Sequence, residues 1–142
     1  MWKNISCVII LGLVALDLTN AFSLTKQEPD PTLTVKEGGS FELSCEVDNY
    51  YEYCKFIHND KMCDFEWKRD VWNITVAACD DYSDRMVWSG NYDYYKCAIT
   101  INDARPEDAG AWSCEIESYA AGKYRGYGYN VTAKFDIDFI AK

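Results

Sequence analysis

The residues of this chain with the clearest chemistry are its cysteines. Seven cysteines occur among 142 residues, and no two of them show the two-residue spacing of a zinc site. Heavy cysteine use without metal-ligand spacing favours a disulfide framework. Such a framework implies an oxidising compartment, and it makes the cysteines poor candidates for zinc ligands.

Few other side chains offer catalytic or metal chemistry. The only histidine, His58, lies in a predicted turn, and no serine or cysteine motif supplies it with a nucleophile. Asp80, Asp81 and Asp84 could collect a calcium ion, but they lack the ordered ligand alternation of a dedicated loop and are interpreted as a solvated cluster. We therefore expect no enzymatic activity, no bound metal and no cofactor.

The charge balance argues against one class of partner. The chain carries 23 acidic and 14 basic side chains, for a formal net charge of −9. Nucleic-acid binding requires a basic face that contacts phosphates. We expect no nucleic-acid partner.

The first 21 residues have the pattern of a secretory signal peptide. A basic residue precedes the apolar run 7–16, and small residues precede a plausible cleavage site after residue 21. Asp17 and Asn20 interrupt the run too early for a membrane anchor. Removal of residues 1–21 would take away Cys7 and leave an even set: Cys45, Cys54, Cys63, Cys79, Cys97 and Cys114. No later apolar segment predicts a membrane span, so we expect a secreted, extracellular product.

The remaining residues, 22–142, are predicted to form one all-β domain. Apolar and polar residues alternate with period two, which is typical of strands with one buried face. The clearest examples are 41–47, 96–101 and 112–116. Many short strands separated by turn residues predict a two-sheet antiparallel sandwich.

A short motif resembles the signature of the immunoglobulin superfamily. The segment Asp108-Ala-Gly-Ala-Trp-Ser-Cys114 is similar to the corner that leads into strand F, with Trp112 in place of the usual tyrosine. Cys45 matches the strand B cysteine. The resemblance implies a disulfide-rich, immunoglobulin-like β-sandwich of the variable-like (V/I) type. Arg85 stands where that type usually has an arginine that pairs with the corner aspartate, Asp108.

One element departs from the family pattern. Strand C normally carries a buried tryptophan, but the corresponding window offers Phe56. Trp67 comes too late in the chain and is assigned to the next strand, C′. We expect Phe56 to face the core with less ring area.

The resemblance also implies a disulfide pairing. Cys45 with Cys114 is the family's central bridge, and the variable-type arrangement makes Cys54 and Cys97 neighbours across the sandwich, which leaves Cys63 for Cys79. Six cysteines allow fifteen connectivities, so only the central bridge is strongly supported. The extra cysteines also look like those of small secreted immunoglobulin-domain proteins of arthropods.

Two asparagines of the predicted domain fit the acceptor rule for N-glycosylation. They are Asn73, in Asn-Ile-Thr, and Asn130, in Asn-Val-Thr. Because a secretory chain meets the transferase, we expect a glycan at each.

Tyrosines dominate the predicted binding surface. Ten of the eleven fall in three clusters: Tyr50, Tyr51 and Tyr53; Tyr92, Tyr94 and Tyr95; Tyr119, Tyr124, Tyr127 and Tyr129. The resemblance places these clusters in the B–C, D–E and F–G connections at one end of the sandwich. Tyrosine beside small polar residues is typical of antibody-type binding loops. Tyr51, Tyr94 and Tyr124 have polar or charged neighbours and are the predicted exposed anchors.

These features lead to a hypothesis about function. We expect a secreted recognition protein that binds an extracellular protein or a surface glycan. Asp48, Glu52 and Asp93 would give the tyrosine-bearing end an acidic character suited to a basic partner. The alternative is a secreted inhibitor or toxin-like effector that blocks a basic target. A homodimer through the sheet of strands G, F, C and C′ also remains open.

Overall fold

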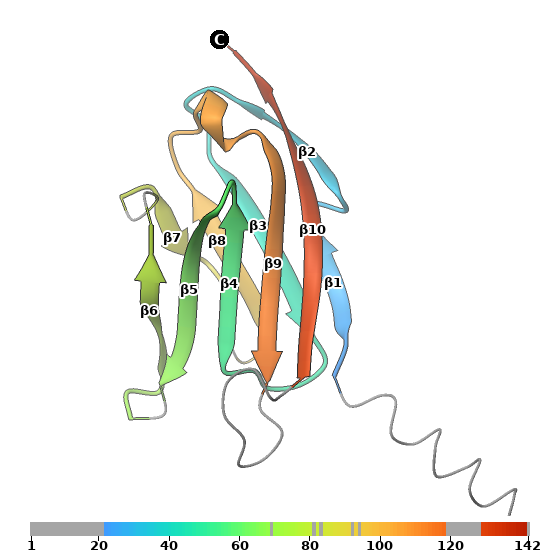
Figure 1. The fold of residues 1–142 in the computed structure, drawn as a ribbon, viewed down its shortest axis with the longest axis vertical. Helices are drawn as coiled ribbons and strands as arrows, with labels where there is room; N and C mark the ends of the chain where they lie inside the picture. The colour runs from blue at the N-terminus through green and yellow to red at the C-terminus, as the bar shows by residue number, and fades with distance from the viewer. Residues whose placement is uncertain are drawn as a thin grey trace, which may run out of the picture.

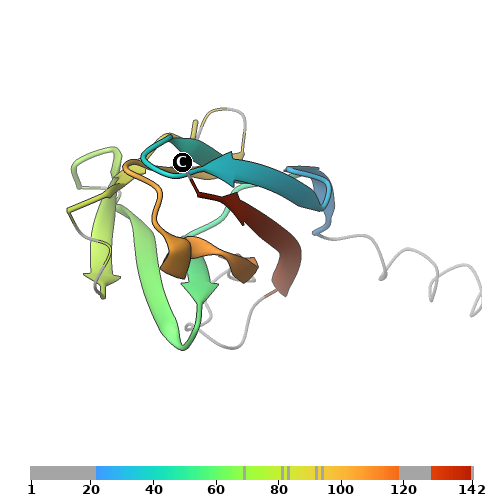
Figure 2. The same cartoon turned by 90° about the horizontal axis from the view of Figure 1, so that it is seen from above.

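The computed structural model describes residues 22–68, 70–80, 82, 84–91, 93, 95–118 and 129–141. The predicted signal peptide lies outside these residues. Ten strands are described, in two sheets that form two layers (Figure 2). They are β1 (Leu24–Glu28), β2 (Thr32–Lys36), β3 (Phe41–Val47), β4 (Tyr53–His58), β5 (Lys61–Lys68), β6 (Asn73–Cys79), β7 (Met86–Trp88), β8 (Lys96–Ile101), β9 (Gly110–Ser118) and β10 (Tyr129–Ile140).

One sheet has four strands in the order β1-β3-β8-β7, and the other has six in the order β2-β10-β9-β4-β5-β6 (Figure 1). All described pairings are antiparallel except that of β2 with β10. The chain changes sheets between β1 and β2, where Pro29 and Pro31 lie. Proline has no backbone N–H to donate to a ladder, so a break in pairing is expected there.

Along β10, the apolar residues of the alternating sequence are buried and the polar residues between them are exposed. In β10, Ala133, Phe135 and Ile137 are buried, whereas the residues between them are exposed. Phe56 is fully buried in the position that a tryptophan usually holds, and Trp67 lies in β5, the next strand. Both placements agree with the sequence analysis.

Three disulfides hold the sandwich together. Cys45 pairs with Cys114, and Cys54 pairs with Cys97, so two bridges join the four-stranded sheet to the six-stranded sheet. The Sγ atoms of Cys54 and Cys114 are 3.9 Å apart, which places the two bridges in contact within the core. The third bridge, from Cys63 to Cys79, links β5 to its neighbour β6. This connectivity is the one expected from the family resemblance.

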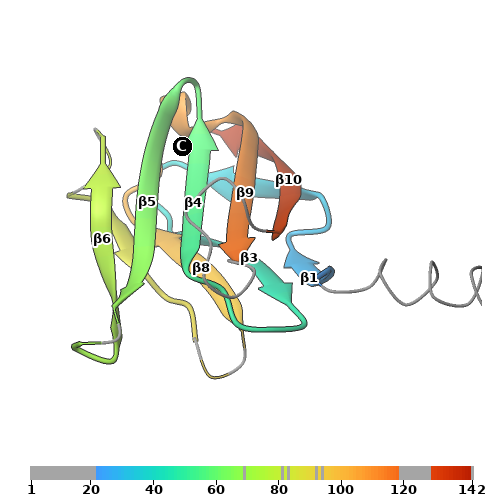
Figure 3. The ribbon, with the colours of Figure 1, turned by 60° about the horizontal axis from the view of Figure 1, so that its bottom comes forward.

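The connections gather at two ends of the sandwich. At the lower end in Figure 1 lie those between β3 and β4, β5 and β6, and β7 and β8, and there β9 ends and β10 begins. At the upper end lie the β4–β5 turn, the segment between β6 and β7, and the β8–β9 connection with a 3₁₀ turn at Pro106–Asp108. Figure 3 brings the lower end forward. The strand ends that flank the predicted binding loops therefore lie at one end of the sandwich, while the corner motif lies at the other.

Candidate binding site at the lower end

Aromatic side chains from separate connections come together at the lower end. Tyr50, which precedes β4, is 59% exposed. Its ring centroid lies 5.0 Å from that of Tyr95, which precedes β8, in an edge-to-face arrangement with an interplanar angle of 79°. Hydrogen bonding with Tyr50 raises the pKa of the Tyr95 phenol. Two of the predicted tyrosine clusters therefore meet in space, although their members are far apart in the sequence.

Tyr51, one of the three predicted anchors, is not at the surface. Its side chain is fully buried, and its hydroxyl donates a hydrogen bond to the backbone carbonyl of Lys96 at 3.3 Å. The prediction that Tyr51 is exposed was wrong because polar neighbours in sequence do not determine which way a ring faces. Successive residues of an extended segment point to opposite sides. Here Tyr50 points outward and Tyr51 packs in the core.

The other two predicted anchors, Tyr94 and Tyr124, lie outside the described residues, and their binding role stays a prediction. Tyr53, from the first cluster, is half-buried, and its hydroxyl donates to the Glu66 carboxylate at 3.0 Å across β4 and β5. Tyr53 therefore belongs to the outer face of the six-stranded sheet.

A second exposed aromatic group at this end was missed by sequence reasoning. Trp72, between β5 and β6, is 80% exposed, and its ring centroid lies 6.3 Å from that of Trp67 in an edge-to-face arrangement. Its φ is 49°, in the left-handed region that bulky residues rarely adopt. The adjacent Val71 is also exposed. No glycine or proline marks the β5–β6 connection in the sequence, so the exposure of Trp72 was not predicted.

The predicted acidic residues lie within two residues of Tyr50 or Tyr95 in the sequence. Asp48 is exposed and accepts hydrogen bonds from the backbone N–H and the hydroxyl of Ser23, at 2.9 and 2.8 Å. These bonds, the backbone one first, lower the pKa of the Asp48 carboxyl. Asp93 is also exposed, and Glu52 is half-buried beside β4. An ionised Asp48 supports the expectation of negative charge at this end.

The residues of the corner motif form a buried ion pair at the upper end. Arg85 donates from Nη1 and Nη2 to the two Asp108 oxygens at 2.7 and 2.8 Å. Trp112, in the place of the usual tyrosine, donates its indole N–H to the Asp108 backbone carbonyl at 2.8 Å. Because an indole can donate as a hydroxyl can, the corner keeps its hydrogen bond to the backbone.

One comparison with known proteins shows the family of this chain, and another shows a shared fold. The sequence matches the immunoglobulin V-set domain family over residues 27–134. The chain belongs to that family. A similar solved structure, the crystal structure of human T-cell immunoglobulin and mucin domain protein 1, has a TM-score of 0.59 at 12% sequence identity. The match covers 79% of this chain and 99% of that one, and it shows a shared fold. Comparison with curated proteins finds no match to the sequence.

The V-set family suggests extracellular recognition in general, and its domains are generally non-catalytic. His58 has a structural environment in this domain: its two ring nitrogens each lie 2.8 Å from a backbone carbonyl oxygen, of Ala111 and Glu107. Its ring stacks on Trp112 at 4.4 Å. These contacts fix the β4–β5 corner against the β8–β9 connection.

Two further features of the V-set domain concern metals and membranes. The sulfur atoms of Cys45, Cys54, Cys97 and Cys114 lie within 4.8 Å of one another, but the two inter-sheet disulfides already join them. In the part of the chain that the structure describes, no helix is long and apolar enough to span a membrane.

Proposed function

We propose that this V-set chain is a secreted, non-catalytic recognition protein whose mature part, residues 22–142, binds an extracellular protein or a surface glycan through its lower end. The observation that carries the proposal is that two exposed rings, Tyr50 and Trp72, lie on separate connections at the lower end, Tyr50 against the half-buried Tyr95 and Trp72 against Trp67. Interfaces gain most of their affinity from a few such rings, while most other contact residues contribute little. The family's general association with extracellular recognition supports the same proposal.

The binding proposal is tested by capture from extracellular fluid with the oxidised domain and its variants. Tyr50→Ala and Trp72→Ala should each weaken retention of a bound partner at least about tenfold, as expected for anchors whose truncation costs 2 kcal/mol or more. Tyr94→Ala and Tyr124→Ala test the remaining sequence-based anchors in the same way. Val87→Ala, an exposed apolar position on β7, is the matched control. If only changes on the outer face of β9, β4 and β5 abolish retention, the lower end is not the binding site.

The acidic residues favour the alternative of an inhibitor or toxin-like effector that blocks a basic target. Asp48 and Asp93 are exposed, and each lies two residues from Tyr50 or Tyr95 in a chain of net charge −9. A basic target would be captured at a rate that falls steeply with ionic strength. Salt-independent capture would exclude this alternative and leave general recognition intact.

Glycans and self-association belong to the same proposal. Asn73 begins β6 and Asn130 lies in β10, and both are exposed. We propose that both carry N-glycans. A glycan on Asn73 would lie next to Trp72, so Asn73→Gln belongs in the capture experiment.

A homodimer through the six-stranded sheet would be crowded by a glycan on Asn130. Sedimentation of Asn130→Gln against the wild type therefore tests whether the domain forms this homodimer.

A further inference from the structure

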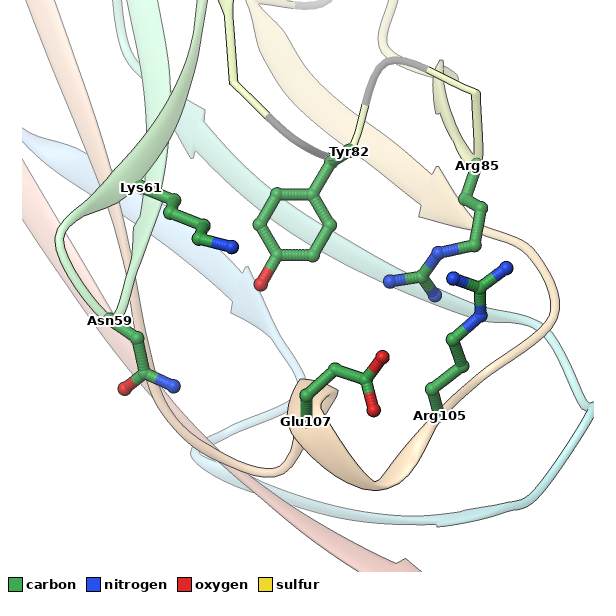
Figure 4. Close-up of a pocket in the computed structure, with 6 residues that line it drawn as sticks. All are labelled: Asn59, Lys61, Tyr82, Arg85, Arg105 and Glu107. Atoms are coloured by element: carbon green, nitrogen blue, oxygen red, sulfur yellow. The ribbon is translucent and has the colours of Figure 1, made fainter.

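A polar cavity of about 280 Å³ lies at the upper end, away from the candidate binding site (Figure 4). Its walls come from three connections that are distant in sequence: the β4–β5 turn, the segment between β6 and β7, and the β8–β9 connection. The lining residues are Asn59, Lys61, Tyr82, Arg85, Arg105 and Glu107. This volume is several times that of one water molecule, which is about 30 Å³.

The side chains that line the cavity include more cations than carboxylates. Three of the lining side chains are cationic, and one is a carboxylate. Figure 4 shows Lys61 entering from one wall and the two arginines from the opposite wall. Arg85 is already paired with Asp108, and Arg105 makes an exposed ion pair with Asp103 at 3.3 Å. Because an exposed pair contributes little, Lys61 and Arg105 are the lining cations that attract an anion in this chain of net charge −9.

The walls of the cavity are fixed by contacts outside it. Tyr82 is buried, and its ring centroid lies 5.4 Å from that of Trp112. Arg85 lies over the Tyr82 ring at 5.5 Å and is held by Asp108. The Arg105 backbone N–H donates to Asp108 Oδ2 at 2.8 Å. The Tyr82 ring and the Arg85 guanidinium are therefore already held in place, so these two groups lose little freedom when a ligand binds.

One buried donor on the cavity wall lacks an acceptor. Arg85 is only 6% exposed, and its Nε has no hydrogen-bond partner among the described residues. The hydrogen bonds and charge of Asp108 raise the pKa of the Arg85 guanidinium, so it remains charged. Buried donors are almost always satisfied in native structures. The described residues therefore leave this charged donor without an acceptor, and an anion in the adjacent cavity would supply one.

We propose that this cavity binds a small, singly charged oxyanion, a carboxylate or sulfate group carried by a polar molecule. Lys61 and Arg105 supply the attraction, Arg85 offers its remaining donor, and the Asn59 amide and the Tyr82 hydroxyl provide polar contacts for the rest of the ligand. Glu107 limits the site to a single negative charge, because a second charge would be repelled by its carboxylate.

The test titrates the oxidised full chain with sodium glucuronate, with methyl sulfate, which carries one negative charge, and with glucose at constant ionic strength. Calorimetry and the chemical shifts of residues around the cavity follow the binding. Glucuronate or methyl sulfate should bind and move the signals of Arg105 and Glu107, with glucose at least about tenfold weaker. Binding of glucuronate alone identifies a carboxylated sugar as the source, and binding of methyl sulfate identifies the sulfate group. Equal binding of glucose, or binding of neither anion, would overturn the proposal.

Three substitutions in the cavity wall should change the affinity for the anion, two by lowering it and one by raising it. Lys61→Gln and Arg105→Gln should each weaken anion binding about three- to tenfold, whereas Glu107→Gln should tighten it by a similar factor. Lys134→Gln, an exposed lysine on β10, is the control for loss of one positive charge. A weaker affinity in Lys134→Gln equal to that in Lys61→Gln, or no tightening in Glu107→Gln, would contradict the assignment.

Discussion

The Asp108 carboxylate is almost fully enclosed and accepts hydrogen bonds from both terminal nitrogens of Arg85 and from the Arg105 backbone N–H. Its backbone carbonyl accepts from Trp112. One residue therefore joins the segment before β7 to the start of β9. A buried charge in this position depends on its partner, because the remaining surroundings cannot replace hydration.

Replacement of Arg85 by alanine should lower the free energy of unfolding by about 3–5 kcal/mol, because the Asp108 carboxylate would remain buried without its counter-ion. Chemical denaturation measures the change. Lys96→Ala removes the more exposed pair with Glu42 and should cost only about 0–1 kcal/mol. A double-mutant cycle of Arg85→Ala with Asp108→Ala that shows no coupling would reject the pairing as a source of stability.

Tyr51 should behave as a core residue in mutagenesis. Tyr51→Ala is expected to cost about 3–5 kcal/mol of stability, since a fully buried ring would leave a cavity. Tyr51→Phe, which keeps the ring but loses the hydrogen bond to Lys96, should cost about 1 kcal/mol. Thermal and denaturant melts distinguish these values. An alanine variant with wild-type stability would place this ring at the surface after all.

Among the elements, the strands with strict alternation were predictable, and those defined by distant pairing were not. β3, β8 and β9 follow from period two in the sequence. β1 and β2 could not be separated in this way, because β1 pairs with β3 whereas β2 runs parallel to β10 at the far end of the chain. β6 is an edge strand with little burial, so its sequence has no alternation to detect.

The sequence analysis predicted at which end of the sandwich the candidate site lies, but it predicted only some of the exposed residues there. The family motif placed the connections at one end, and this placement follows from strand order alone. Which rings face solvent depends on the local path of each connection, as the opposite orientations of Tyr50 and Tyr51 show. Trp72 was missed because its exposure depends on the β5–β6 connection, whose boundaries the sequence does not mark with glycine or proline.

The junction between β1 and β3 gives a prediction about pH. The Ser23 hydrogen bonds lower the pKa of Asp48, so this contact stabilises the fold above the ordinary carboxyl pKa of about 3.9. Its contribution is lost as the pH falls through the lower, folded-state value. In Ser23→Ala the hydroxyl bond disappears and only the backbone bond remains, so the pKa of Asp48 should rise toward its ordinary value. An NMR titration measures it, and an unchanged pKa would contradict the assigned cause.

At the scale of the whole molecule, two adjacent disulfides connect the two sheets, and the third links the edge strand β6 to β5. Peptide mapping of the oxidised protein should find the pairs Cys45–Cys114, Cys54–Cys97 and Cys63–Cys79, with no free thiol among these six. Replacing both Cys45 and Cys114 by alanine should cost about 2–5 kcal/mol. We expect the domain to remain folded, because the bridge from Cys54 to Cys97 still links the same two sheets. A free Cys45 in the wild type would contradict the fold.

The two ends of the described chain lie at opposite ends of the sandwich. Ser23 is tied to Asp48 at the lower end, and β10 finishes at the upper end with Ile140, whose carbonyl accepts from the Glu37 N–H (Figure 1). A label or a solid support attached after Ile140 would therefore stand at the same end of the sandwich as the arginine-lined cavity and leave the lower end facing outward. An attachment before Ser23 would stand at the lower end instead, so the choice of tether decides which of the two ends an assay can report on.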